Sequence, residues 1–227
     1  MRRMLPTLGL LLVIPGLLSC SGKRGDERPA SGPAAGDGSA VSVSAASGPR
    51  VVFLGDSLTA GYGLAEDQAF PALLGELLEQ EGRPVEVVNA GVSGDTTAGG
   101  LARVDWILAQ APEVVVVGLG GNDALRGLPL DGTEENLREI VTRCQASGAR
   151  VLLLGMRMLP NYGPDYVRRF ESIYPRLAKE LDVPLVPFLL AKVGGVRRLN
   201  QDDGIHPTAE GQRLVAQNVL PYLRKLV

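Results

Sequence analysis

A serine with chemical potential stands close behind an apolar run near the start of the folded part of the chain. Residues 51–54 are all apolar and lead through Gly55 and Asp56 into Ser57. Such a run is typical of a strand that is buried on both faces, as in a parallel sheet. Ser57 would then lie at the carboxyl end of that strand, where open α/β sheets place their ligands. We interpret Ser57 as a candidate nucleophile; the alternative is that Ser57 or Asp56 only caps the next helix.

A nucleophilic serine needs a base and a group that orients the base. The chain has one histidine, His206. Asp203, three residues earlier, can turn back to the Nδ1–H and leave Nε2 free to face the serine. Asp202 competes for this role, but the spacing favours Asp203. A surface turn or half of a metal site is the alternative for this Asp-x-x-His spacing, and without a second histidine or a cysteine cluster a zinc site is not expected.

Two glycine-rich turns could supply donors to a developing oxyanion. Gly94, in the segment 89–95, could present its backbone N–H with no side chain in the way. Asn122, in the segment 120–123, could add its side-chain amide, and the N–H of Ser57 would be a third donor. Each turn is weak support alone, because glycine and asparagine are common wherever strands end.

The elements that must position these residues alternate along the chain. Apolar runs predict strands, and stripes at helical spacing predict the helices between them. Pro175 predicts a kink or break in the fourth of these helices, and Thr208 is expected to cap the last one. This order predicts an α/β fold, a three-layer α/β/α sandwich around a five-stranded parallel sheet. The expected strands are 51–54, 85–88, 114–119, 151–154 and 185–188, and the expected helices are 66–81, about 101–108, about 137–147, 165–181 and 208–223.

Taken together, the motifs resemble the SGNH (GDSL) hydrolase family over residues 50–227. Within the family, the chain looks most like the bacterial arylesterase and lysophospholipase/thioesterase I group. The resemblance implies a flavodoxin-like strand order and a serine hydrolase that needs neither cofactor nor metal. The matching residues are Ser57, Gly94, Asn122 and His206, within the stretches 55–63, 89–95, 120–123, 159–163 and 201–207.

Two loops are candidates for substrate contacts. By the family resemblance, the loop 158–164 with Tyr162 flanks the acyl pocket; otherwise it is a proline-rich surface connection. Leu125 and Leu128 could form another apolar wall after Asn122. The absence of a long insertion predicts an open site for short-to-medium acyl esters, thioesters or lysophospholipids. The alternatives are O-deacetylation of a polysaccharide and a non-catalytic surface lipoprotein that binds acyl or glycan ligands.

The N-terminus has the pattern of a secretion signal. Two arginines precede an apolar run over residues 4–18, and the segment 17–20 resembles a bacterial lipobox. Residues 1–20 are therefore expected to be a lipoprotein signal peptide, with Cys20 lipidated; a plain cleaved signal is the alternative. Ser21 after the cysteine favours the outer membrane, so we expect a lipid-anchored protein of the bacterial cell envelope. Residues 21–49 are rich in Gly, Ala, Ser and Pro and predict a flexible tether before the catalytic domain, 50–227.

The composition limits the classes of partner that we expect for this protein. The net charge is −2, and the sequence contains no basic stripe, so a nucleic-acid partner is not expected. The expected partners are a small acyl substrate and the membrane, and the expected state is a monomer. Cys144, in an apolar helical pattern, is expected to be a buried and inert thiol.

Overall fold

The computed structural model describes residues 48–158 and 162–227, so the predicted signal peptide, Cys20 and most of the predicted tether lie outside the described residues. Five parallel strands form one sheet in the order β2-β1-β3-β4-β5. This is the flavodoxin-like order that the family resemblance implies. The strands are β1 (Arg50–Gly55), β2 (Glu86–Gly91), β3 (Val114–Gly118), β4 (Arg150–Leu154) and β5 (Leu185–Val186).

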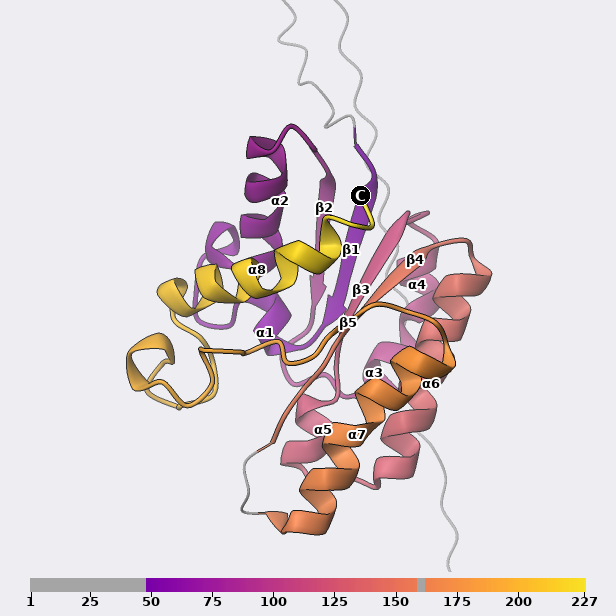
Figure 1. Ribbon diagram of the computed structural model, residues 1–227, viewed down its shortest axis with the longest axis vertical. Coiled ribbons are helices and arrows are strands. Elements are labelled where there is room, and N and C mark those ends of the chain that lie inside the picture. The colour runs from indigo at the N-terminus through magenta and orange to yellow at the C-terminus, as the bar shows by residue number, and fades with distance from the viewer. Residues whose placement is uncertain (1–47, 159–161) are drawn as a thin grey trace, which may run out of the picture. The chain divides into compact units, whose positions relative to one another are not determined.

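Helices cover both faces of the sheet, which confirms the predicted three-layer sandwich (Figure 1). One layer holds α2 (Phe70–Gln80) and α8 (Ala209–Leu223). The other holds α3 (Thr97–Ala102), α4 (Val104–Leu108), α6 (Leu130–Ala146) and α7 (Pro164–Glu180). Two short helices, α1 (Ser57–Ala60) and α5 (Gly121–Leu125), begin directly after β1 and β3, at the carboxyl edge of the sheet.

The middle of the sheet is the centre of the core. Val51 to Leu54 of β1 and Val114 to Val117 of β3 are fully buried, because β1 and β3 have a strand on either side and helices on both faces. This explains why both strands are unbroken apolar runs rather than alternating patterns.

Several predicted boundaries were wrong. The predicted helix 66–81 is a 3₁₀ turn (Glu66–Gln68) followed by α2, because Pro71 lacks an N–H and favours a first helical turn. The predicted helix 101–108 is two helices separated at Arg103, whose side chain turns toward the end of β1. Helix α7 shows no break at Pro175, since its buried face anchors the helix on both sides of the proline.

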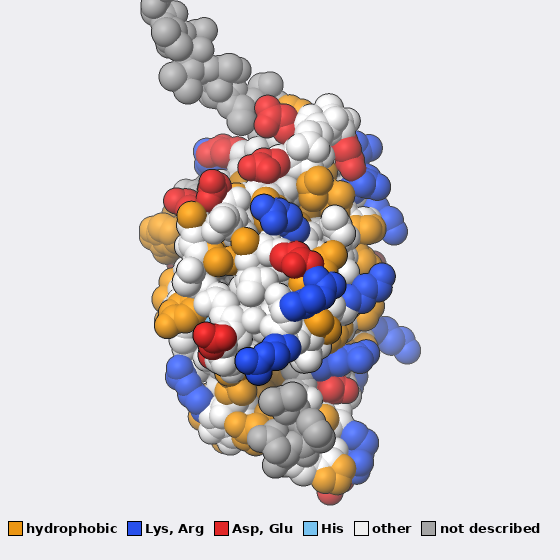
Figure 2. All heavy atoms as spheres, turned by 90° about the vertical axis from the view of Figure 1, so that its left-hand side faces the viewer, with side chains coloured by type: hydrophobic (Ala, Val, Ile, Leu, Met, Phe, Trp, Pro, Cys, Tyr) orange, Lys and Arg blue, Asp and Glu red, His pale blue; other side chains and the backbone are white. Residues whose placement is uncertain are grey.

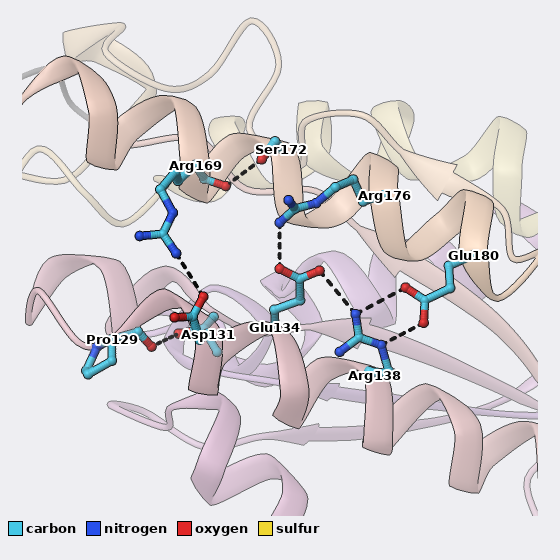
Figure 3. Close-up of polar contacts among 9 residues, drawn as sticks. Pro129, Asp131, Glu134, Arg138, Arg169, Ser172, Arg176 and Glu180 are labelled. Atoms are coloured by element: carbon cyan, nitrogen blue, oxygen red, sulfur yellow. Dashed lines mark hydrogen bonds and ion pairs between the residues drawn. The ribbon is translucent and has the colours of Figure 1, made fainter.

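Ion pairs join α6 to α7 along their exposed sides (Figure 3). Arg138 donates to both carboxylate oxygens of Glu180, at 2.7 and 3.1 Å, and to Glu134 at 3.1 Å. Arg169 of α7 likewise donates to Asp131 of α6. These charges join the exposed sides of the two outer helices. Among residues 48–158 and 162–227, no helix combines the length and apolarity that a membrane crossing requires.

Candidate active site

Ser57 lies at a sharp turn from strand to helix. Strand β1 ends at Gly55, and Asp56 caps α1 by accepting the N–H of Leu58 at 3.0 Å. The capping alternative therefore holds for Asp56, and Ser57 is left as the first residue of α1. Gly55 is required for space: a Cβ there would lie 2.0 Å from Oγ1 of Thr59. The turn thus places the Ser57 hydroxyl at the carboxyl edge of the sheet.

The structure brings Ser57, His206 and Asp203 together. Nε2 of His206 lies 2.8 Å from Oγ of Ser57, and Nδ1 lies 2.6 Å from Oδ2 of Asp203. The other oxygen of Asp203 accepts the N–H groups of Ile205 and His206, which fixes the carboxylate in its loop. The bond to the His206 side chain is the main cause that lowers the pKa of Asp203 to about 2. Asp203, not Asp202, is thus the carboxylate on the imidazole.

A residue that sequence reasoning missed joins the histidine loop to the serine segment. Gln201 donates its backbone N–H to the carbonyl of His206 at 2.7 Å. Its side chain donates to the carbonyl of Tyr62 at 2.7 Å and to that of Pro207 at 3.1 Å. Because Tyr62 follows α1 closely, this side chain links the segments that carry base and nucleophile. No pattern in the sequence distinguishes Gln201 from any other polar loop residue.

The predicted oxyanion donors line the same cavity as Ser57. Gly94 has a φ of +81°, a left-handed conformation that favours glycine. Within the described part of the chain, no protein acceptor takes the N–H of Ser57 or of Gly94. The amide of Asn122 donates to the carbonyl of Asp95 at 2.9 Å and lies 3.4 Å from Oδ2 of Asp56. Two backbone donors are thus free for a ligand, and the third group is held beside them.

A second network that the sequence did not reveal supports these donors. Arg103 donates through Nε to Oδ2 of Asp95 at 2.8 Å and through Nη2 to the carbonyl of Gly55 at 3.0 Å. Both partners of the ion pair are mostly buried, with 20% and 12% of their side chains exposed. Arg126 donates to the carbonyl of Gly94 at 2.8 Å. The loop that carries Gly94 is therefore tied to the turn that carries Ser57.

The cavity at this site has a volume of about 550 Å³ and a mainly apolar lining. Leu125, a candidate for substrate contact, belongs to this lining. Tyr162 and Leu128 are not among the described residues that line it; both take part in bonds around the adjacent loop. The hydroxyl of Tyr162 donates to the carbonyl of Leu125, and the carbonyl of Leu128 accepts from Tyr166. The apolar lining residues are Leu58, Tyr62, Ala124, Leu125, Met156, Met158, Phe188, Leu190 and Ile205.

Other ionisable groups near the site have structural partners. Burial is the main cause that raises the pKa of Asp56 to about 6. Asp123 is buried and accepts from the backbone and hydroxyl of Thr97 and from Thr133, so it holds a turn.

Burial also raises the pKa of Cys144 on α6 to about 12, which leaves the thiol unreactive. Among the described residues, no cluster of three or more His, Cys, Asp or Glu side chains could hold a metal ion.

Comparisons with known proteins agree with this geometry. A family described as "GDSL-like Lipase/Acylhydrolase family" matches residues 53–214. Esterase TesA of Pseudomonas aeruginosa is 44% identical over 183 residues, which are 80% of this chain and 91% of that protein. Thioesterase 1/protease 1/lysophospholipase L1 of Escherichia coli is 44% identical over 81% of this chain and 87% of its own length. A crystal structure of TesA, 45% identical in sequence, superposes with a TM-score of 0.76. The superposition covers 78% of this chain and 99% of the TesA chain.

Proposed function

This chain belongs to the GDSL-like lipase/acylhydrolase family and is a carboxylic ester hydrolase, and we propose that Ser57, His206 and Asp203 carry out its reaction. The substrates are short-to-medium acyl esters, thioesters or lysophospholipids. The apolar lining of the cavity supports an acyl chain as the bound group, rather than the sugar of an acetylated polysaccharide.

The proposed mechanism has two halves. Ser57 attacks the ester carbonyl while His206 takes its proton, and Asp203 stabilises the imidazolium. The N–H groups of Ser57 and Gly94 and the amide of Asn122 stabilise the oxyanion. His206 then protonates the leaving alcohol or thiol, which leaves an acyl ester on Ser57. Water activated by the same imidazole attacks this ester and releases the acid.

One observation carries the proposal: the single histidine of the chain lies 2.8 Å from the Ser57 hydroxyl and is held by Asp203 on its other nitrogen. A serine that only capped a helix would not need the hydrogen-bonded pair of His206 and Asp203 beside it. Ser57 and His206 are 149 residues apart in sequence, so their contact is a property of the fold.

A fluorophosphonate probe tests the assignment, because it phosphonylates only an activated serine. We expect the wild-type protein to be labelled and to hydrolyse p-nitrophenyl acetate, and Ser57→Ala and His206→Ala to do neither. Ser172→Ala is the matched control: Ser172 donates to the carbonyl of Arg169 on the surface of α7, and this variant should behave as wild type. Retained turnover in a folded Ser57→Ala protein would refute the assignment.

We also propose that Cys20 is lipidated and holds the protein, as a monomer, at the bacterial cell envelope. The sequence supports this through the lipobox-like segment 17–20 and the tether that follows it. Fractionation of cells tests it: wild-type protein should stay with the membranes, and Cys20→Ser should lower the membrane-bound share. Mass spectrometry of the N-terminal peptide would identify the acyl groups directly.

A further inference from the structure

Exposed large hydrophobic side chains gather around the mouth of the active site. Tyr62, Leu125 and Ile205 line the cavity and are 51%, 44% and 41% exposed. The hydroxyl of Tyr162, also exposed, donates to the carbonyl of Leu125. Apart from these four residues and the two valines described next, Trp106 on α4 is the one exposed large hydrophobic side chain among the described residues.

Two further exposed valines complete this group. Val92 is 47% exposed and precedes Ser93, and Val196 is 37% exposed and follows Gly195; both neighbours line the cavity. We call the set Tyr62, Val92, Leu125, Tyr162, Val196 and Ile205 the mouth patch. Scattered surface hydrophobics need no explanation, but apolar side chains gathered at one place mark an interaction surface.

Positive charge accompanies the mouth patch. Arg126 follows Leu125, Arg157 lines the cavity with its guanidinium 5.2 Å from the centre of the Phe188 ring, and Arg197 follows Val196. None of the three pairs with a carboxylate among the described residues. The segment between β5 and α8 faces the viewer in Figure 2, and on this side basic, acidic and hydrophobic side chains are interspersed.

The carboxylates nearby do not balance these arginines. Asp95 is paired with Arg103. Asp203 bonds an imidazole that carries charge only when protonated, so its negative charge offsets one of the three arginines. Asp56 and Asp123 are only 2% exposed. In the hollow that adjoins the cavity, Asp202 is the one carboxylate without an ion pair among described residues. The mouth therefore presents apolar side chains to a partner within a rim of excess positive charge.

We propose that the mouth patch docks on the surface of an anionic lipid aggregate, a bilayer or micelle. Apolar side chains and tyrosines suit the boundary between headgroups and acyl chains, and each arginine near an anionic surface strengthens binding. An acyl chain could then pass from the lipid into the cavity without crossing water. This proposal rests on the proposed function, since it names the form in which an acyl substrate is met.

Hydrogen exchange of the full-length protein tests the docked orientation, and it separates docking from any effect of the N-terminus. With vesicles of phosphatidylglycerol, amides in the segments 92–94, 125–128 and 194–205 should exchange at least about threefold more slowly. Vesicles of phosphatidylcholine should give a weaker effect. Amides around Trp106 should not change, because α4 precedes β3 and so lies near the opposite edge of the sheet.

A pair of variants sharpens the test. Val196→Ser with Arg197→Gln should lower the affinity for phosphatidylglycerol vesicles about tenfold, since one basic residue alone contributes about fivefold. Trp106→Ser, which removes a more exposed apolar side chain away from the mouth, should leave the affinity unchanged. Both variants should hydrolyse soluble p-nitrophenyl acetate like the wild type, so loss of docking is distinguishable from loss of catalysis.

Three outcomes would overturn the proposal. The first is equal protection by the two kinds of vesicle, or none. The second is the same loss of affinity in Trp106→Ser as in the double variant. The third is slow exchange at the mouth that depends on protein concentration without vesicles, which would assign the patch to a second copy of the chain.

Discussion

The guanidinium of Arg103 joins Asp95 to the end of β1. Its Nε lies 2.8 Å from Oδ2 of Asp95, while Nη2 lies 3.0 Å from the carbonyl of Gly55. The carbonyl of Asp95 in turn accepts the amide of Asn122. One side chain thus ties together the three segments that carry the proposed oxyanion donors, and this gives Arg103 a positioning role.

Arg103→Met should lower kcat about tenfold to a hundredfold with a small change in KM. The donors would lose their fixed spacing, and a misplacement of about 1 Å can cost about a hundredfold in rate. Arg103→Lys should recover part of the loss, because an ammonium can reach one of the two acceptors but not both. Steady-state kinetics with a soluble ester gives both constants.

Arg138→Met is the matched control for Arg103. It removes an arginine of similar size from the ion pairs between α6 and α7 (Figure 3). We expect about 1 kcal/mol or less of lost stability and an unchanged kcat, since partly exposed ion pairs contribute little. A fall in kcat as large as that of Arg103→Met would mean that both losses reflect general loosening.

Asn122→Ala should lower kcat more than it raises KM. In the proposed mechanism, the amide stabilises charge that develops in the transition state, and removal of one such donor costs about 10²–10³ in rate. Asn122→Asp, which keeps the size but replaces the donor by a carboxylate, should be at least as inactive. If KM rises while kcat stays constant, Asn122 binds the substrate instead.

Gln201→Leu should lower kcat about tenfold or more. This variant loses the bonds to Tyr62 and Pro207, so the loop that holds His206 is no longer fixed to the serine segment. Gln201→Glu keeps the size but not the donor and should show a similar loss. The rate of fluorophosphonate labelling, which reports the Ser57–His206 contact, should fall in parallel with kcat.

Ser57, Gly94 and Asn122 could be predicted from the sequence because the motif of each follows a strand. Parallel strands end at one edge of the sheet, so Ser57, Gly94 and Asn122 had to converge there. The supporting groups could not be predicted in this way. Arg103 and Gln201 each bond a backbone carbonyl that is remote in sequence, that of Gly55 and that of Tyr62, and a carbonyl has no sequence signature. Helix boundaries at Pro71 and Arg103 also depended on tertiary contacts rather than on the apolar pattern.

The buried carboxyl of Asp56 should make stability depend on pH. Burial raises its pKa from an ordinary value of 3.8 to about 6. Between these values, the folded protein holds a proton that the unfolded chain has released. The contribution of Asp56 to the free energy of unfolding therefore falls as pH rises through about 4 to 6, by about 3 kcal/mol in all.

Asp56→Asn removes this titration and keeps an oxygen that can cap α1. We expect the difference in free energy of unfolding, variant minus wild type, to increase by about 3 kcal/mol from pH 4 to pH 7. This change does not depend on the size of the difference at pH 4. Urea denaturation of both proteins at several pH values measures the difference. A difference that stays constant over this range, or that grows in favour of the wild type, would mean that Asp56 is ionised in the folded protein throughout.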